Sequence, residues 1–271
     1  MKTRIISGAV IAVVTAVLLV LKGWVLFAAC YLLSLMGVHE FFKGFKAMNI
    51  TPNFAIAAGS VTVLYAVAAL GERGAGVLGG DMGSWMMAWL FATVVACLLY
   101  LFKIEVRKPE DAMATITGIV YVGFFFYHLA AIGMLDGYSI FVWMVMITAF
   151  VTDTCAYFSG VFVGKHKMTP VISPKKTWEG AVGGVIGTII VSGIFGFVFM
   201  RPLLVDCMVI GLLGAVISMF GDLTASIFKR KMGIKDYGSL IPGHGGILDR
   251  FDSVLFTAPV IYYYIVLVIG A

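Results

Sequence analysis

Charged side chains are scarce in this chain, and that scarcity excludes an ordinary soluble globular protein. Asp, Glu, Lys and Arg make up 12% of the 271 residues, whereas a soluble domain typically carries about 25%. Hydrophobic residues make up 61%, and the mean hydropathy is +1.04. No polar stretch is long enough for a separate soluble domain. The composition therefore predicts one membrane-embedded domain over residues 1–271.

Cysteine is also sparse, and its placement argues against disulfide or zinc chemistry. The four cysteines stand singly in or beside apolar runs and form no CxxC pair (Cys30, Cys97, Cys155 and Cys207). The net charge of +5 does not require a nucleic-acid partner, because basic loops are expected beside anionic membrane lipids. We expect membrane lipids, and no nucleic acid, among the partners.

Long apolar runs predict an all-α polytopic membrane protein with about nine transmembrane helices. The runs cover about 4–22, 24–38, 53–70, 84–102, 113–135, 138–160, 180–200, 204–225 and 252–270. The second run is short and could extend through residues 39–42 as an amphipathic continuation. The first resembles a secretory signal peptide, but Lys22 and the apolar run that follows favour a retained helix.

The basic residues divide unevenly between the two sides that nine helices would create. Of 19 Lys and Arg residues, 16 fall on the side of the N-terminus and only three on the other. The three exceptions are Lys22, Arg73 and Arg201. Since cytoplasmic loops carry the excess of Lys and Arg, the split predicts a cytoplasmic N-terminus and an external C-terminus.

The longest polar interruption is the segment from Ser226 to Asp252. It contains five basic residues, three carboxylates, His244 and five glycines. Such a mixture suggests a site for phosphate and metal. The alternative is an ordinary basic cytoplasmic loop. The glycines beside His244 allow positive φ and close backbone approach, as a turn that cradles phosphate requires.

Aspartates near the expected cytoplasmic ends of helices are further candidates. An ionised Asp153 or Asp222 at the membrane boundary is costly unless it is paired or bound to metal; a structural ion pair is the alternative. Asp222, Ser226, Lys229 and Arg230 follow helical spacing and would share one face. Asp249 and Asp252 are also spaced to share a face, although an N-cap role is favoured for Asp252.

A second polar loop, residues 164–180, lies on the same predicted side. Ser173, Lys175, Lys176 and Thr177 supply hydroxyls and cations, and Thr177 could cap the following helix. Trp178 is interpreted as an anchor at the membrane interface.

Taken in order, these residues resemble the phosphatidate cytidylyltransferase family, the CDP-diacylglycerol synthases. The pattern is S-x-x-K-R-x(4)-K-D-x-G followed by H-G-G-x-x-D-R-x-D, with S-P-K-K-T-W-E-G upstream. The resemblance covers residues 153–252 and is only general in the N-terminal half. It implies that residues 1–135 form a scaffold and lipid-facing part, and that residues 136–271 carry the catalytic helices and loops.

The resemblance implies a reaction in which CTP and phosphatidate give CDP-diacylglycerol and pyrophosphate, with Mg²⁺ and a possible second cation. It implies three groups of residues: catalytic Asp222, Lys229, Arg230, Asp249, Arg250 and His244; substrate-binding Ser173, Lys175, Lys176, Thr177, Ser226, Lys235, Gly245 and Gly246; and metal-binding Asp222, Asp249, Asp153 and Asp252. We expect Lys175, Lys176 and Thr177 to bind CTP, and Lys229 and Arg230 to lie nearer the phosphate being transferred.

Two other functions use the same features. A transporter or channel for an anionic solute would place its polar groups near the bilayer midplane, whereas here they gather at one side. A CTP-dependent lipid kinase would release CDP instead of pyrophosphate. The implied location is the inner (cytoplasmic) membrane with the active site facing the cytoplasm, and a homodimer is compatible with the sequence.

The topology is testable by cysteine labelling. Single cysteines at positions 239 and 84, replacing Ser239 and Ser84 in a background without the native cysteines, should react with a membrane-impermeant reagent from opposite sides. Labelling of both from the same side would overturn the helix count.

Overall fold

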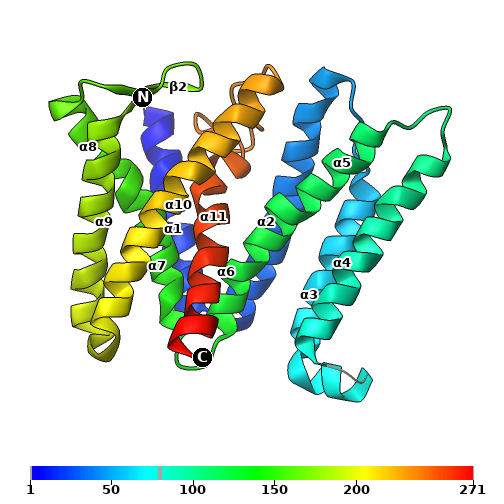
Figure 1. Cartoon of the computed structure of the whole chain (residues 1–271), viewed down its shortest axis with the longest axis horizontal. Helices are drawn as coiled ribbons and strands as arrows, with labels where there is room; N and C mark the ends of the chain where they lie inside the picture. Colours follow the sequence, from blue (N-terminus) through cyan, green and yellow to red (C-terminus); the bar gives the residue numbers. More distant parts are fainter. Residues whose placement is uncertain (1, 79–80, 271) are drawn as a thin grey trace.

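Long apolar helices packed side by side make up the computed structural model of the chain (Figure 1), which describes residues 2–78 and 81–270. Within those residues, eight helical segments are long and apolar enough to cross a membrane, and a shorter apolar helical segment, Ile6–Leu21, precedes them. The expected all-α polytopic membrane fold is therefore confirmed. The main helices are α1 (Lys2–Leu21), α2 (Gly23–Phe45), α3 (Phe54–Leu78), α4 (Met82–Leu99), α5 (Pro109–Gly118), α6 (Phe125–Met134), α7 (Val142–Met146), α8 (Thr152–Val163), α9 (Trp178–Phe199), α10 (Leu204–Lys231) and α11 (Leu248–Tyr264).

Short helical turns complete several of these helices. Three are π-helical, namely η3 (Ile119–Phe124), η5 (Ile147–Val151) and η7 (Ile265–Ile269). Four are 3₁₀ turns, namely η1 (Lys46–Met48), η2 (Tyr100–Phe102), η4 (Ser139–Phe141) and η6 (Arg201–Leu203). As a result, α5, η3 and α6 form one continuous span, as do η4, α7, η5 and α8.

The ends of three helices differ from the apolar runs. Helix α2 continues to Phe45 because Phe41, Phe42 and Phe45 are buried, which confirms the amphipathic continuation. Helix α10 runs on to Lys231. Helix α11 begins at Leu248, so Asp252 lies inside the helix and not at its N-cap. The prediction of an N-cap at Asp252 was wrong because polar contacts, and not only apolar residues, start this helix.

The glycine-rich segment over residues 71–84 is partly helical. The helix breaks at Gly71, which has φ 57° and ψ −158°, and a helical segment then continues to Leu78. Such a φ is readily available to glycine alone. Asp81 accepts a hydrogen bond from the Ser84 backbone N–H and caps α4. Residues 79 and 80 of this segment lie outside the described residues, as do the side chains of Lys2, Arg4 and Arg73.

The polar loops gather at one end of the bundle, which we call the site end. It comprises the connections over residues 46–53, 103–108, 164–177 and 232–247, and α1 also starts there, whereas η7 ends at the opposite end (Figure 1). The third connection contains a small antiparallel hairpin of β1 (Lys167–Thr169) and β2 (Ser173–Thr177). The first described helix therefore starts at the site end, and the last described helical turn finishes at the opposite end.

Glycines allow α8 and α9 to approach closely. The Cα of Gly180 would lie 3.8 Å from a Cβ added at Gly160, and a Cβ at Gly184 would come within 3.0 Å of the Thr152 carbonyl oxygen. Small residues permit such approach where larger side chains would separate the helices. The site ends of α8 and α9 are consequently held together beside the hairpin.

Candidate functional site

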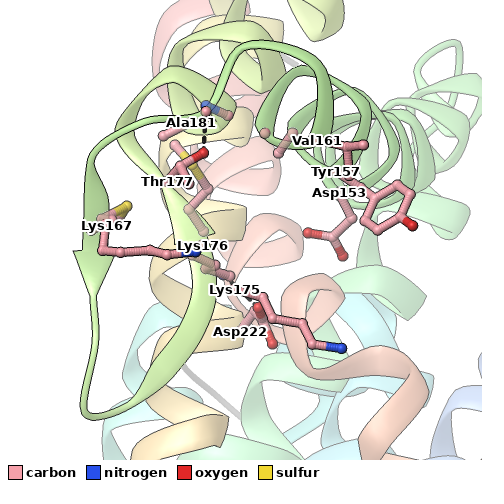
Figure 2. A pocket seen from close by; sticks show the side chains of 15 residues that line it. Asp153, Tyr157, Val161, Lys167, Lys175, Lys176, Thr177, Ala181 and Asp222 are labelled. Carbon is pink, nitrogen blue, oxygen red and sulfur yellow. Dashed lines mark hydrogen bonds and ion pairs between the residues drawn. The ribbon is translucent and has the colours of Figure 1, made fainter.

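A cavity of about 540 Å³ opens at the site end between α8, the hairpin, α9 and α10. Figure 2 shows side chains from these elements facing it. Its polar lining residues are Asp153, Tyr157, Lys167, Lys175, Lys176, Thr177 and Asp222. Five of these seven were predicted from the sequence as substrate-binding or metal-binding residues, whereas Tyr157 and Lys167 were not. The cavity is thus lined by three lysines and two carboxylates.

The base of the hairpin is fixed by two side chains. Thr177 is the N-cap of α9 and accepts a hydrogen bond from the Gly180 backbone N–H at 3.1 Å, so the expected cap is confirmed. Glu179 accepts hydrogen bonds from the backbone N–H of Lys165 at 3.1 Å and of His166 at 3.2 Å. These contacts set the direction of β2, whose Lys176 forms an ion pair with Asp222 inside the cavity.

Three aspartates form what we call the carboxylate cluster: Asp153 on α8, Asp222 on α10 and Asp252 on α11. Asp222 lies close enough to the other two for their negative charges to repel. Lys176 reduces this repulsion from one side. Lys229 does so from another, with its Nζ 3.9 Å from Asp252 Oδ2. The structure therefore brings together residues from helices that are far apart in the sequence.

Asp249 lies beside the cluster but is held by protein donors. Its Oδ1 is 3.0 Å from Lys229 Nζ, and its Oδ2 accepts hydrogen bonds from the backbone N–H of Tyr237 at 2.8 Å and of Gly246 at 3.0 Å. Its side chain is 1% exposed. The role of Asp249 as a metal ligand stays a prediction, and a metal would have to share these oxygens with the protein.

The loop before α11 has the backbone that its glycines suggested. Gly243 and Gly245 have φ of 77° and 85°, so the expected positive φ is found at both. The Ile241 N–H donates to the Gly245 carbonyl at 2.9 Å, and the His244 N–H donates to Ile241. The His244 ring rests against α1, where a Cβ at Gly8 would lie 3.5 Å away.

Tyr237 anchors the same loop from the inside. Its hydroxyl donates a hydrogen bond to the Ala225 carbonyl at 3.1 Å. Burial raises the pKa of the Tyr237 phenol well above its usual range, and the nearby charges of Asp252 and Asp249 act in the same direction. The phenol therefore stays protonated and keeps donating to α10.

The other predicted residues are spread around the site. Ser226 and Arg250 are half-buried, and Ser173 lies in β2. Arg230 and Lys235 are exposed, and among the described side chains no ion pair links Arg230 to Asp222. The expected place of Arg230 near the phosphate being transferred stays a prediction.

Glu40 on α2 is a site residue that the sequence did not reveal. It is 8% exposed, and its two carboxylate oxygens accept hydrogen bonds from the backbone N–H of Ile247 at 3.1 Å and of Leu248 at 2.9 Å. These N–H groups begin α11 and would otherwise lack partners. A carboxylate within an apolar helix is itself a signal, since its burial is costly without such partners.

Comparison with known proteins identifies the relatives of this chain. The sequence model of the cytidylyltransferase family matches residues 2–268. The chain belongs to this family.

Several relatives carry the name phosphatidate cytidylyltransferase. The one from Synechocystis sp. is 32% identical over an alignment that covers 99% of this chain and 98% of the relative. That of Staphylococcus saprophyticus is 33% identical over 96% and 97%. That of Bacillus subtilis is 38% identical over 66% and 67%.

The resemblance to the family implied Mg²⁺, and the donor chemistry of the site is compatible with it. In residues 2–78 and 81–270, no three His, Cys, Asp or Glu side chains form a ready-made metal site. Mg²⁺ usually binds through one or two carboxylates, with substrate phosphates and water completing its shell. Asp153 and Asp222, which line the cavity and repel each other, provide such a pair of carboxylates.

The capping role of Glu40 leads to a stability prediction. Glu40→Ala leaves two buried N–H groups without partners, at a cost of about 1–3 kcal/mol each. We expect a lower thermal unfolding midpoint in detergent and reduced enzymatic activity. Glu110→Ala, at an exposed carboxylate in the first turn of α5, is the control and should change neither. An unchanged midpoint for Glu40→Ala would show that the cap is dispensable.

Proposed function

We propose that this chain is a phosphatidate cytidylyltransferase, which makes CDP-diacylglycerol and pyrophosphate from CTP and phosphatidate. The observation that carries the proposal is the cavity of paired lysines and carboxylates at one end of a membrane-spanning bundle. Both substrates are anions, one soluble and one held in the bilayer, so their reaction requires cations at the membrane boundary. Membership of the cytidylyltransferase family, and relatives bearing this name, support the same activity.

In the proposed reaction, an oxygen of the phosphatidate phosphate attacks the α-phosphorus of CTP. A new P–O bond forms there, and the bond from the α-phosphorus to the oxygen shared with the β-phosphorus breaks. That oxygen leaves with pyrophosphate. Because a phosphate monoester is already a nucleophile near neutral pH, no Ser–His dyad is needed. The main task of the protein is to hold two anions together and to stabilise the charge that develops on the leaving group.

The lysines of the cavity are suited to this task. Lys167, Lys175 and Lys176 reach it from the hairpin, and lysine binds polyphosphate as a compact positive charge. When CTP binds, Lys176 would leave its ion pair with Asp222 and pair with a phosphate of CTP. Lys229, next to Asp252, would lie on the other side of the transferred phosphate.

We assign Asp222 and Asp153 as the residues that would hold Mg²⁺. When bound, this ion would neutralise phosphate oxygens and stabilise the pentacoordinate transition state. Asp249 and Asp252 retain their predicted role as metal-binding residues.

The site end is proposed to face the cytoplasm in the inner membrane. This orientation agrees with the excess of basic residues on that side, and it would give CTP direct access while phosphatidate enters from the bilayer. The transporter alternative receives no support, because the charged groups of the cavity lie at one end of the bundle rather than midway along it. The lipid-kinase alternative is not supported by the names of the relatives.

Removing the charge of Asp222 tests the metal assignment. Asp222→Asn should lower CDP-diacylglycerol formation by about 100-fold or more, since a lost metal ligand commonly costs several kcal/mol of transition-state stabilisation. Production of the lipid and of pyrophosphate would be measured with purified protein and Mg²⁺. Asp136→Asn, at an exposed position of the opposite end, should retain full activity. Near-normal turnover of Asp222→Asn at saturating Mg²⁺ would reject this ligand.

Lys176 tests the role of the hairpin. Lys176→Ala should raise the KM for CTP by about 10- to 100-fold and change kcat less, because groups on a surface hairpin supply mainly substrate binding. Steady-state kinetics with CTP varied at saturating phosphatidate would measure both. Lys165→Ala is a matched control, since Lys165 is exposed and lies outside the cavity lining. A change confined to kcat would contradict the assignment.

A further inference from the structure

Tyr121 has a buried hydroxyl group near the carboxylate cluster. It lies in the π-helical turn η3, in the N-terminal half of the chain, and the residue is 6% exposed. Among the described residues its hydroxyl oxygen has no hydrogen-bond partner. A buried hydroxyl without a partner costs about 1–3 kcal/mol, and such groups are uncommon in folded proteins. The hydroxyl therefore requires a partner that the described residues do not provide.

The ring of Tyr121 is held in a fixed place by aromatic neighbours. It stacks on Phe228 of α10 with ring centroids 5.7 Å apart, and it meets Phe256 of α11 edge-on at 5.9 Å and Phe41 of α2 at 5.5 Å. These contacts surround the ring with aromatic side chains from three helices. The ring makes these contacts without its hydroxyl, so a phenylalanine at position 121 would pack equally well.

The same neighbours place Tyr121 beside the carboxylate cluster. Phe256 follows Asp252 by four positions on α11, so the two share one face of that helix. The phenol also lies within electrostatic range of the carboxylates of Asp252 and Asp222. The buried hydroxyl consequently borders the region where, on the proposed function, the phosphate groups of the substrates react.

The chemistry of a phenol selects the missing partner. A tyrosine hydroxyl is a neutral donor that can serve an anionic oxygen without adding a positive charge. Hydrogen bonds to charged acceptors are the stronger ones. Lysines already surround the cavity, and a neutral donor on the apolar side of the cluster would complete the coordination of a phosphoryl oxygen there.

We propose that Tyr121 donates a hydrogen bond to a phosphoryl oxygen of bound substrate at the carboxylate cluster. This inference rests on the proposed function, and it makes the N-terminal half of the chain contribute directly to the site. The residue acts as a substrate-contacting donor and not as an acid or base. Its hydroxyl is left without a protein partner because the partner arrives with the substrate.

The test compares two tyrosine-to-phenylalanine variants. Tyr65 is a buried tyrosine whose hydroxyl has a partner, Ser34 Oγ at 3.0 Å, on α2. Tyr121→Phe should lower kcat/KM by about 10- to 100-fold, the loss of one hydrogen bond to a charged group, while its thermal unfolding midpoint stays equal or rises. Tyr65→Phe should lower the midpoint and keep kcat/KM. Assays well below both midpoints exclude unfolding as a cause.

The outcomes separate this inference from the proposed function. Unchanged kcat/KM in Tyr121→Phe would overturn the inference, as would a protein that fails to fold or has a clearly lowered midpoint, since the hydroxyl would then have a structural role. Wild-type protein that makes no CDP-diacylglycerol would instead overturn the proposed function. Loss of kcat/KM at an unlowered midpoint supports the inference.

Discussion

Carboxylates at one end of this apolar bundle require partners of opposite charge or hydrogen-bond donors. The lysines and backbone N–H groups that serve as these partners hold the site together. An unpaired charge away from water is costly. Lys176 pairs with Asp222, Lys229 pairs with Asp249, and Glu40 accepts two backbone N–H groups of α11. Each of these contacts joins segments that hydropathy alone would leave free to slide past one another in a membrane.

The pairing also explains why both halves of the chain are needed at the site end. Glu40 and Phe41, from α2, contact the start of α11 and the ring of Phe228. The predicted division into a scaffold over residues 1–135 and a catalytic part over residues 136–271 stays a prediction, but the two parts pack together around the loop before α11. A substrate bound among these ion pairs would replace contacts that the protein now makes with itself.

Much of the fold could be predicted from the sequence because membrane insertion depends on properties of continuous segments. A run of about 20 apolar residues suffices to identify a span, and the runs correspond to the observed helices. Local backbone features were predicted equally well: Thr177 caps α9, and Gly243 and Gly245 adopt positive φ. Errors occurred at ends set by distant contacts, as with Asp252, which lies inside α11 because Glu40 helps to start that helix earlier.

The sequence by itself determined the class of the protein, the positions of its helices and most of the polar residues around the cavity. Each of these follows from composition, spacing or a contiguous motif. Only the tertiary structure decided that Lys176 meets Asp222, that Arg230 is exposed, and that Glu40 binds the first backbone N–H groups of α11. Those facts depend on which faces of separate helices meet, and helix-face contacts between segments more than 200 residues apart, such as Glu40 with Leu248, leave no pattern in a single sequence.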